Sequence, residues 1–188
     1  MRDILEDLSL HILDIAENSI NADARTIEIK IIEDLKKDLL LVEISDDGKG
    51  MDRAFADKAT DPFVTTREGR RVGLGLSLFA EAARISNGRL SIHPGPQGGT
   101  TIEAQFQHSH IDRKPLGDIG QTIMTLVGGN PELDLVYVHE RDEQRYRFDT
   151  KVIKARLGGE SMNSPDGIKL IGCLAHKTYS FLIRLTNS

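Results

Sequence analysis

The apolar positions at the start of the chain repeat at helical spacing. Four of them share one face: Leu5, Leu8, Ile12 and Ile15. This spacing predicts a helix that ends near residues 21–23. Polar side chains occupy an adjoining face of the same helix: Asp7, His11, Asp14, Asn18 and Asn21. A helix that only filled a core would not need this polar face, so we expect the face to border a functional site.

The pattern then changes from helical to alternating. Residues 26–32 (TIEIKII) and 39–45 (LLLVEIS) alternate apolar with polar side chains. A polar, turn-like segment separates them, which predicts an antiparallel hairpin with one buried face. Residues 46–51 (DDGKGM) follow and interrupt regular structure with two glycines.

A second helix and a second pair of strands complete this part of the chain. The helix is expected over residues 73–88, and the strands over 89–95 and 100–107. The pair Asn87-Gly88 is a typical stop signal for a helix. Residues 52–72 lack clear periodicity and predict a long loop. The order of elements indicates an α+β fold: a two-layer sandwich of a mixed or antiparallel sheet with helices on one face.

After a connection at residues 108–115 the pattern of the sequence changes. The expected elements are a helix at 116–129, a hairpin of strands at 133–140 and 144–149, a short helix at 150–159, and a helix at 168–185. We therefore expect one domain over residues 1–108 and a C-terminal α/β extension over residues 111–188. The extension carries no motif that can be attached to chemistry.

Composition and charge narrow the possible partners. The formal net charge of −5, with acids and bases interspersed, does not indicate a nucleic-acid or membrane surface. No apolar run is long enough to span a membrane, and the acidic start of the chain does not resemble a signal peptide. The single cysteine, Cys173, cannot form an internal disulfide and suits a small buried hydrophobic position. A cytoplasmic location is the expectation.

Several short motifs are weak indicators of function when taken one at a time, but their order along the chain is specific. They are the Asp-x-x-x-Asn of the first helix, Asp-x-Gly-x-Gly after the hairpin, DPFVTTR at residues 61–67, Gly-Leu-Gly-Leu at residues 73–76, and Gly-Gly-Thr at residues 98–100. This order resembles the GHKL (Bergerat-fold) ATP-binding domain shared by histidine kinases, DNA gyrase, mismatch-repair ATPases and large chaperone ATPases. The resemblance covers residues 8–107, and it implies that residues 1–108 form a histidine-kinase-like ATP-binding domain.

The resemblance implies roles for two residues of the first helix. Asn18 matches the amide that ligates the Mg²⁺ bridging the nucleotide phosphates, and a neutral oxygen ligand suits this cation. Asp14 lies one turn earlier, where ATP-hydrolysing relatives carry a glutamate that acts as general base. Aspartate is one methylene shorter than glutamate. His11 shares the Asp14 face, either as a support of the site or as a structural residue.

By the same resemblance, the motif after the first strand pair and the turn within the second strand pair imply an adenine site. Asp46 matches the aspartate that accepts a hydrogen bond from the adenine amino group, because a carboxylate accepts and does not donate. Gly48 and Gly50 allow the backbone to approach the base and turn sharply. Thr100 matches a residue that contacts the adenine edge, directly or through water. Asp47 is expected to help order water bound to the magnesium ion.

The segment between the hairpin and the second helix implies a nucleotide lid. Phe63 is expected to anchor the lid by apolar packing, and three neighbours to donate hydrogen bonds to phosphate: Thr65, Thr66 and Arg67. At the start of the second helix, the bare backbone N–H groups of Gly73, Leu74 and Gly75 are expected to bind phosphate.

The expected function is that of an ATP·Mg²⁺-binding, kinase-like ATPase. It would phosphorylate or regulate a partner protein in trans, as a histidine- or serine-kinase-like enzyme or an ATPase in signal transduction. The chain starts close to the nucleotide-binding helix, so a preceding hairpin with a phosphoacceptor histidine is not expected. The alternative is a nucleotide-dependent binding switch with little turnover. The extension either contacts a partner or a second copy of the chain, or it completes the fold.

Overall fold

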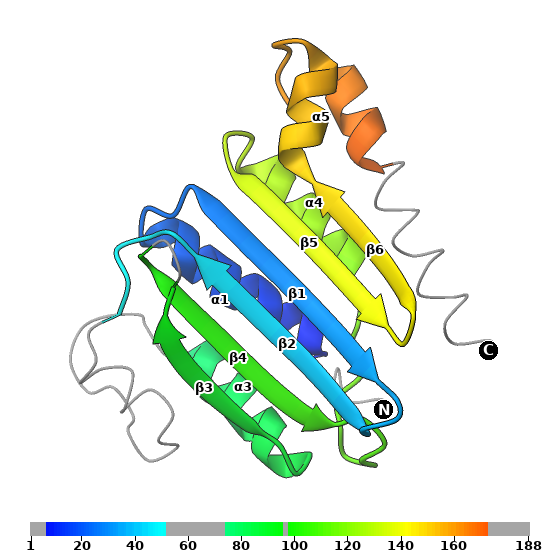
Figure 1. Ribbon diagram of the computed structural model, residues 1–188. Helices are drawn as coiled ribbons and strands as arrows, with labels where there is room; N and C mark the ends of the chain where they lie inside the picture. Colours follow the sequence, from blue (N-terminus) through cyan, green and yellow to red (C-terminus); the bar gives the residue numbers. More distant parts are fainter. Residues whose placement is uncertain (1–6, 52–73, 96–97, 173–188) are drawn as a thin grey trace, which may run out of the picture.

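The computed structural model describes residues 7–51, 74–95 and 98–172 (Figure 1). Its centre is a six-stranded sheet with the strand order β3-β4-β2-β1-β5-β6. The strands are β1 (Thr26–Asp34), β2 (Leu39–Asp46), β3 (Arg89–Pro94), β4 (Thr100–Gln107), β5 (Asp134–Arg141) and β6 (Gln144–Asp149). The helices are α1 (Leu8–Asn21), α3 (Leu74–Ile85), α4 (Ile119–Gly129) and α5 (Thr150–Leu157), and residues 165–172 are also helical.

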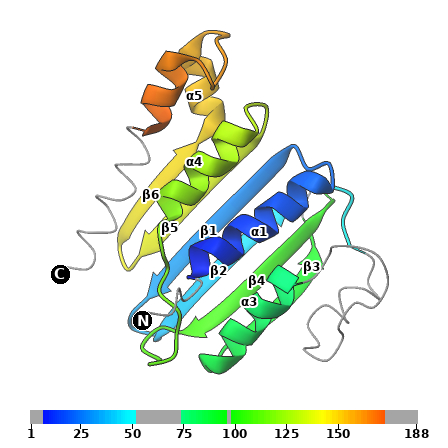
Figure 2. The ribbon, with the colours of Figure 1, turned by 180° about the vertical axis from the view of Figure 1, so that it is seen from behind.

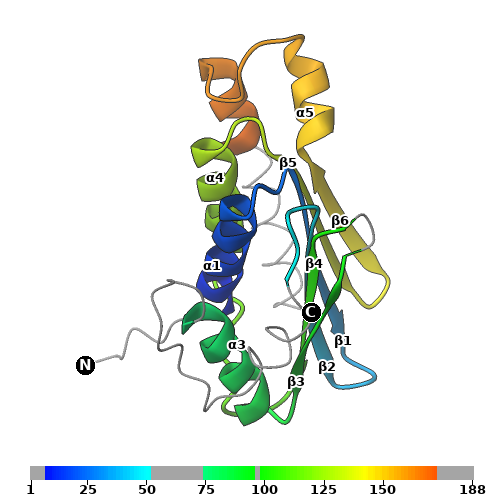
Figure 3. The same cartoon turned by 90° about the vertical axis from the view of Figure 1, so that its left-hand side faces the viewer.

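The helices α1, α3 and α4 cover one face of the sheet (Figures 2 and 3). Strand β1 pairs antiparallel with β2 and parallel with β5, so the sheet is mixed. The predicted two-layer α+β sandwich is therefore confirmed. Among the described residues, no helix is both long enough and apolar enough to cross a membrane.

Alternation along the strands supplies the buried layer between sheet and helices. Ile27, Ile29 and Ile31 of β1 are fully buried, while Glu28 between them is exposed. On α1, the apolar face predicted from the sequence is buried, including Ile12. Burying side chains of this size contributes about 1.5–3 kcal/mol each. The same burial fixes which side of α1 faces away from the core, and that side carries the polar residues.

The end of α3 shows why a glycine follows it. Asn87 adopts a left-handed conformation with φ of +54°, and the Gly88 N–H donates to the carbonyl of Ala83 at 2.8 Å. A Cβ on Gly88 would overlap the backbone carbonyl of Gln105 on β4. The predicted stop therefore also allows α3 and β4 to approach closely.

The strands of the expected extension lie in the same sheet as the strands of residues 1–108. Strand β5 runs parallel to β1 along its whole length, starting where the Asp134 N–H donates to the Arg25 carbonyl at 2.9 Å. Helix α4 packs beside α1 on the covered face (Figure 2). The predicted hairpin within residues 133–149 is present as β5 and β6.

A buried polar cluster joins β1, the end of β4 and β5. The Glu33 carboxylate accepts hydrogen bonds from His139 Nε2 at 2.8 Å and from His108 Nε2 at 2.9 Å. Tyr137 Oη lies 2.8 Å from His139 Nδ1. Tyr137 and His139 are fully buried, and burial raises the pKa of the Tyr137 hydroxyl. This network ties β5 to β1 and to the end of β4.

Candidate functional site

Asp46 is the centre of a polar constellation at the end of β2. Its Oδ1 accepts from the backbone N–H of Gly48 at 2.9 Å and of Thr100 at 3.3 Å. Its Oδ2 accepts from the Ser19 hydroxyl of α1 at 2.8 Å. The side chain is 9% exposed. Because a carboxylate oxygen has two lone pairs, Oδ2 keeps one acceptor position beyond the Ser19 bond.

Glycines from two turns surround this carboxylate. Gly50 and Gly99 adopt φ of +74° and +66°, a region that disfavours other residues. A Cβ on Gly99 would overlap the Asp46 backbone carbonyl, and one on Gly50 would lie 3.1 Å from the Gly99 carbonyl. A Cβ on Gly48 would lie 2.9 Å from the Ala22 carbonyl at the end of α1. Backbone from α1, the loop after β2 and the β3–β4 turn therefore converges on Asp46.

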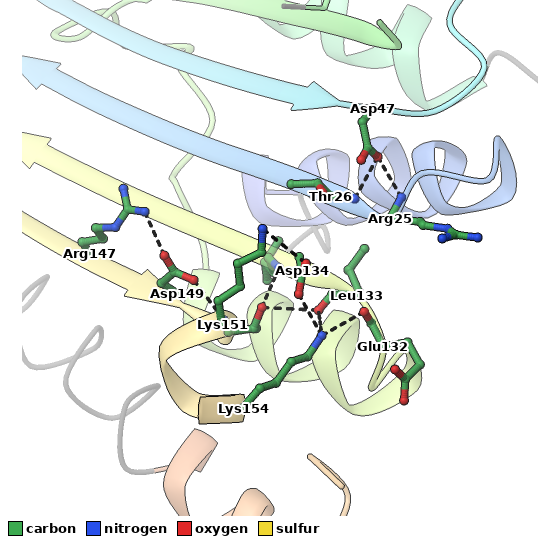
Figure 4. Close-up of polar contacts among 12 residues, drawn as sticks. Arg25, Thr26, Asp47, Glu132, Leu133, Asp134, Arg147, Asp149, Lys151 and Lys154 are labelled. Carbon is green, nitrogen blue, oxygen red and sulfur yellow. Dashed lines mark hydrogen bonds and ion pairs between the residues drawn. The ribbon is translucent and has the colours of Figure 1, made fainter. Parts of the chain in front are cut away.

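Asp47, the next residue, binds the backbone at the start of β1. Its Oδ1 accepts from the backbone N–H groups of Arg25 and Thr26, both at 2.8 Å (Figure 4). Burial raises the pKa of the Asp47 carboxyl, but these backbone hydrogen bonds outweigh burial and hold it below its usual value. The Asp47 carboxylate therefore fastens the turn between α1 and β1, and its expected role in ordering magnesium-bound water stays a prediction.

The second half of the site lies between α1 and α3. Asp14 is exposed on α1, and its carboxylate lies against Gly75 in the first turn of α3. A Cβ on Gly75 would overlap Asp14 Oδ2, so the absence of a side chain at Gly75 is what admits this carboxylate. The partial positive charge at a helix N-terminus favours an anion at this position.

Asn18 is half-buried, one turn after Asp14 on the same helix. Ser19, which bonds to Asp46, is its neighbour in the chain. Helix α1 thus carries residues of both halves of the site. Within residues 7–51, 74–95 and 98–172, no three His, Cys, Asp or Glu side chains are arranged to hold a metal ion.

The structure describes only some of the other residues that the sequence predicts for the site. Phe63, Thr65, Thr66, Arg67 and Gly73 lie outside the described residues, and Leu74 is described by its backbone alone. Thr100 lies beside Asp46, and its side chain is buried. The structure therefore brings together Asp46, Gly48, Gly50 and Thr100 as one group, and Asp14 and Gly75 as another.

Two contacts near the site were not predicted from the sequence. Ser19 was assigned no role, although its spacing on the helix places it toward the sheet, where Asp46 ends β2. His11 is 3% exposed, stacks on Phe79 with ring centroids 5.6 Å apart, and lies 3.2 Å from Lys114 Nζ. No local pattern pairs His11 with Lys114, because 103 positions separate them.

Other features of the fold do not coincide with this constellation. A surface hollow of about 470 Å³ lies at the opposite end of β2, where Lys37, Leu39 and Arg89 are among its lining residues. It contains none of the expected site residues. Near the start of β5, Lys154 Nζ bonds to Asp134 Oδ1 at 2.9 Å and fastens α5 to the sheet (Figure 4). The site chemistry is therefore concentrated at the end of β2 and along α1.

Comparisons with known proteins point to one family. A model of the family described as "Histidine kinase-, DNA gyrase B-, and HSP90-like ATPase" matches residues 4–110. An NtrY-like protein of Rickettsia conorii, named as a sensor histidine kinase, is 30% identical over 111 residues, which is 58% of this chain and 18% of that protein. The signal transduction histidine-protein kinase ArlS of Staphylococcus epidermidis is 26% identical over 95 residues, which is 48% of this chain and 21% of that protein.

Among solved structures, the Aquifex aeolicus MutL ATPase domain complexed with ADP is similar, with a TM-score of 0.44 and 15% identity. That similarity covers 83% of this chain and 69% of the MutL chain. The chain spans only about a fifth of the two histidine kinase relatives.

Proposed function

The chain belongs to the family of histidine kinase-, DNA gyrase B- and HSP90-like ATPases, and on that premise we propose that it binds ATP with Mg²⁺ and acts on a partner protein as a kinase-like ATPase. The observation that carries the proposal is the buried Asp46 carboxylate, which keeps one acceptor position among glycines of two converging turns. An adenine amino group donates to such an acceptor, whereas the O6 of guanine cannot. The site is therefore expected to select ATP over GTP.

The residues of α1 would hold the phosphate end of the nucleotide. The Asn18 amide oxygen would be a ligand of Mg²⁺, which takes its other ligands from phosphate and water. Bound Mg²⁺ would neutralise charge on the phosphates. The backbone N–H groups of Gly73, Leu74 and Gly75 at the start of α3 would bind phosphate oxygens.

Asp14 is the proposed general base or water-orienting residue. Its carboxylate is exposed and faces the first turn of α3, where phosphate is expected to bind. From that position it could accept a proton from a water or a hydroxyl nucleophile. The second candidate function is a nucleotide-dependent binding switch without turnover. Asp14 distinguishes the two functions, because a switch of this kind does not need a general base.

The first experiment tests binding. Calorimetry of the full chain with ATP, with GTP, and with ATP in EDTA should show tight binding only for ATP with Mg²⁺. Asp46→Asn replaces an acceptor by an amide and should weaken ATP binding at least about tenfold, with or without metal. Asn18→Ala should weaken binding only in the presence of Mg²⁺. Wild-type protein that binds neither nucleotide would overturn the proposal.

The second experiment tests turnover. Phosphate release and transfer from radiolabelled ATP should be measured for wild type and Asp14→Asn, which is nearly isosteric. Loss of turnover with unchanged ATP affinity would support Asp14 as the base. If wild type binds ATP but neither releases nor transfers phosphate with any partner that co-purifies in the presence of ATP, the binding switch is the better description.

A further inference from the structure

The chain that follows β4 returns to the start of α1. The Leu8 N–H donates to the carbonyl of Pro115 at 3.0 Å, and the Thr122 hydroxyl of α4 donates to the carbonyl of Ser9 at 3.3 Å. Gly117 adopts φ of +79°, and a Cβ there would overlap the N-cap carboxylate of α1. Residues 114–122, here termed the clamp segment, therefore hold the first turn of the helix that carries Asp14 and Asn18.

Lys114 of the clamp segment contacts a buried side chain of α1. Its Nζ lies 3.2 Å from His11 Nε2, and His11 is 3% exposed. An ammonium group can only donate, so a hydrogen bond at this contact requires Nε2 as acceptor and a neutral imidazole that carries its proton on Nδ1. The ring also stacks on Phe79 of α3, with an angle of 30° between the ring planes. The contact from Lys114 thus ends inside the interface between α1 and α3.

The contacts of His11 and Asp14 lie one helical turn apart in the interface between α1 and α3. His11 precedes Asp14 by one turn on α1, and Phe79 follows Gly75 by one turn on α3. Since His11 faces Phe79 and Asp14 faces Gly75, the two helices run in opposite directions past each other. A shift of His11 relative to Phe79 would move Asp14 relative to the first turn of α3.

We propose that Lys114 is a positioning residue for the nucleotide site, acting through His11 to hold α1 against α3 so that Asp14 and Asn18 face the phosphates. The proposal rests on the proposed ATP·Mg²⁺ binding. It gives the clamp segment a role beyond completing the fold. Asp46 is held by backbone N–H groups of two turns outside α1 and by Ser19, which lies two turns beyond His11 on α1. The adenine end of the site should therefore depend much less on Lys114 than the phosphate end.

The test uses the full chain in three variants: Lys114→Met, Lys114→Arg and, as a matched control, Lys36→Met in the exposed β1–β2 turn. Calorimetry with ATP, with and without Mg²⁺, measures how much the metal tightens binding. Lys114→Met should lose about tenfold of the Mg²⁺-dependent gain and keep the metal-free affinity, as expected for loss of a residue that orients a ligand. Lys114→Arg can still donate to Nε2 and should recover most of the gain. Lys36→Met should match wild type.

A second readout does not need nucleotide. The imidazole ¹⁵N shifts of His11 should show an unprotonated Nε2 in wild type and a different tautomer population in Lys114→Met. The proposal is overturned if these shifts are unchanged, if Lys114→Met binds like wild type, or if it loses the same factor with and without Mg²⁺. Wild type that fails to bind ATP, despite the expected His11 tautomer, would instead overturn the proposed function and with it the role of Lys114.

Discussion

The Glu33 cluster allows a prediction with a magnitude. Burial of Glu33 raises the pKa of its carboxyl, but the hydrogen bonds from His139 and His108 outweigh burial and lower it from 4.5 to about 2. A difference of that size corresponds to about 3 kcal/mol of folding free energy. Replacing Glu33 with Gln should therefore destabilise the protein by about 3 kcal/mol at neutral pH, because one amide oxygen cannot serve both imidazoles as a carboxylate does.

The pH dependence has a definite sign. Since the folded-state pKa of Glu33 lies below the ordinary value, its contribution is complete above the ordinary value of 4.5. It is lost as the pH falls from 4.5 toward about 2, where the folded protein also binds the proton. The free energies of unfolding of wild type and Glu33→Gln should therefore converge at acid pH.

Urea unfolding followed by circular dichroism at pH 7, 5 and 3 would measure the difference. Glu28→Gln is the matched control, because Glu28 lies on the same strand with an exposed side chain. That control should stay within about 0.5 kcal/mol of wild type. A Glu33→Gln effect below about 1 kcal/mol at pH 7, or one that is the same at all three pH values, would refute the assignment of the ionised cluster.

Three further substitutions test the site. Gly75→Ala should displace only the flexible Asp14 carboxylate. Phosphate release should therefore fall to the level of Asp14→Asn, while the melting temperature is kept or raised. A stable variant with full turnover would contradict this. Gly99→Ala meets the Asp46 backbone at a positive φ and should lose more than about 2 kcal/mol in urea unfolding; wild-type stability would contradict that geometry. Asp47→Ala removes two backbone hydrogen bonds and should cost about 2 kcal/mol in urea unfolding; wild-type stability would contradict this, and calorimetry of the same variant with ATP and Mg²⁺ tests the expected role in ordering magnesium-bound water.

Much of the fold is encoded locally. The period of the apolar positions predicted α1, the β1–β2 hairpin, α3 and the β5–β6 hairpin, because a helix and a half-buried strand each impose their own repeat on the sequence. The order of these elements was enough to predict a two-layer α+β sandwich. The order of short motifs within them indicated the family, and residues 4–110 match it.

The candidate site could be predicted from the sequence only in part. Asp46 could be placed at the end of a strand among glycines from the sequence alone, since each of these features is local. Two of the hydrogen-bond donors around Asp46 could not be placed in this way, because Ser19 and Thr100 lie 27 and 54 residues away in the chain. The contacts of Asp47 were likewise not visible in the motif, because the backbone N–H groups that its carboxylate binds belong to Arg25 and Thr26, more than 20 residues earlier in the chain.

The sequence by itself determined the type and order of the elements, the apolar faces that they bury, and the residues available for nucleotide chemistry. Only the tertiary structure decided that β5 pairs with β1 and that Lys114 reaches His11. The physical reason is that periodicity records whether a side chain faces a core, but not which distant strand or helix forms the other side of that core. The same limit applies to α1: its polar face was visible in the sequence, and its contacts with Gly75 and Phe79 were set by the packing of α3.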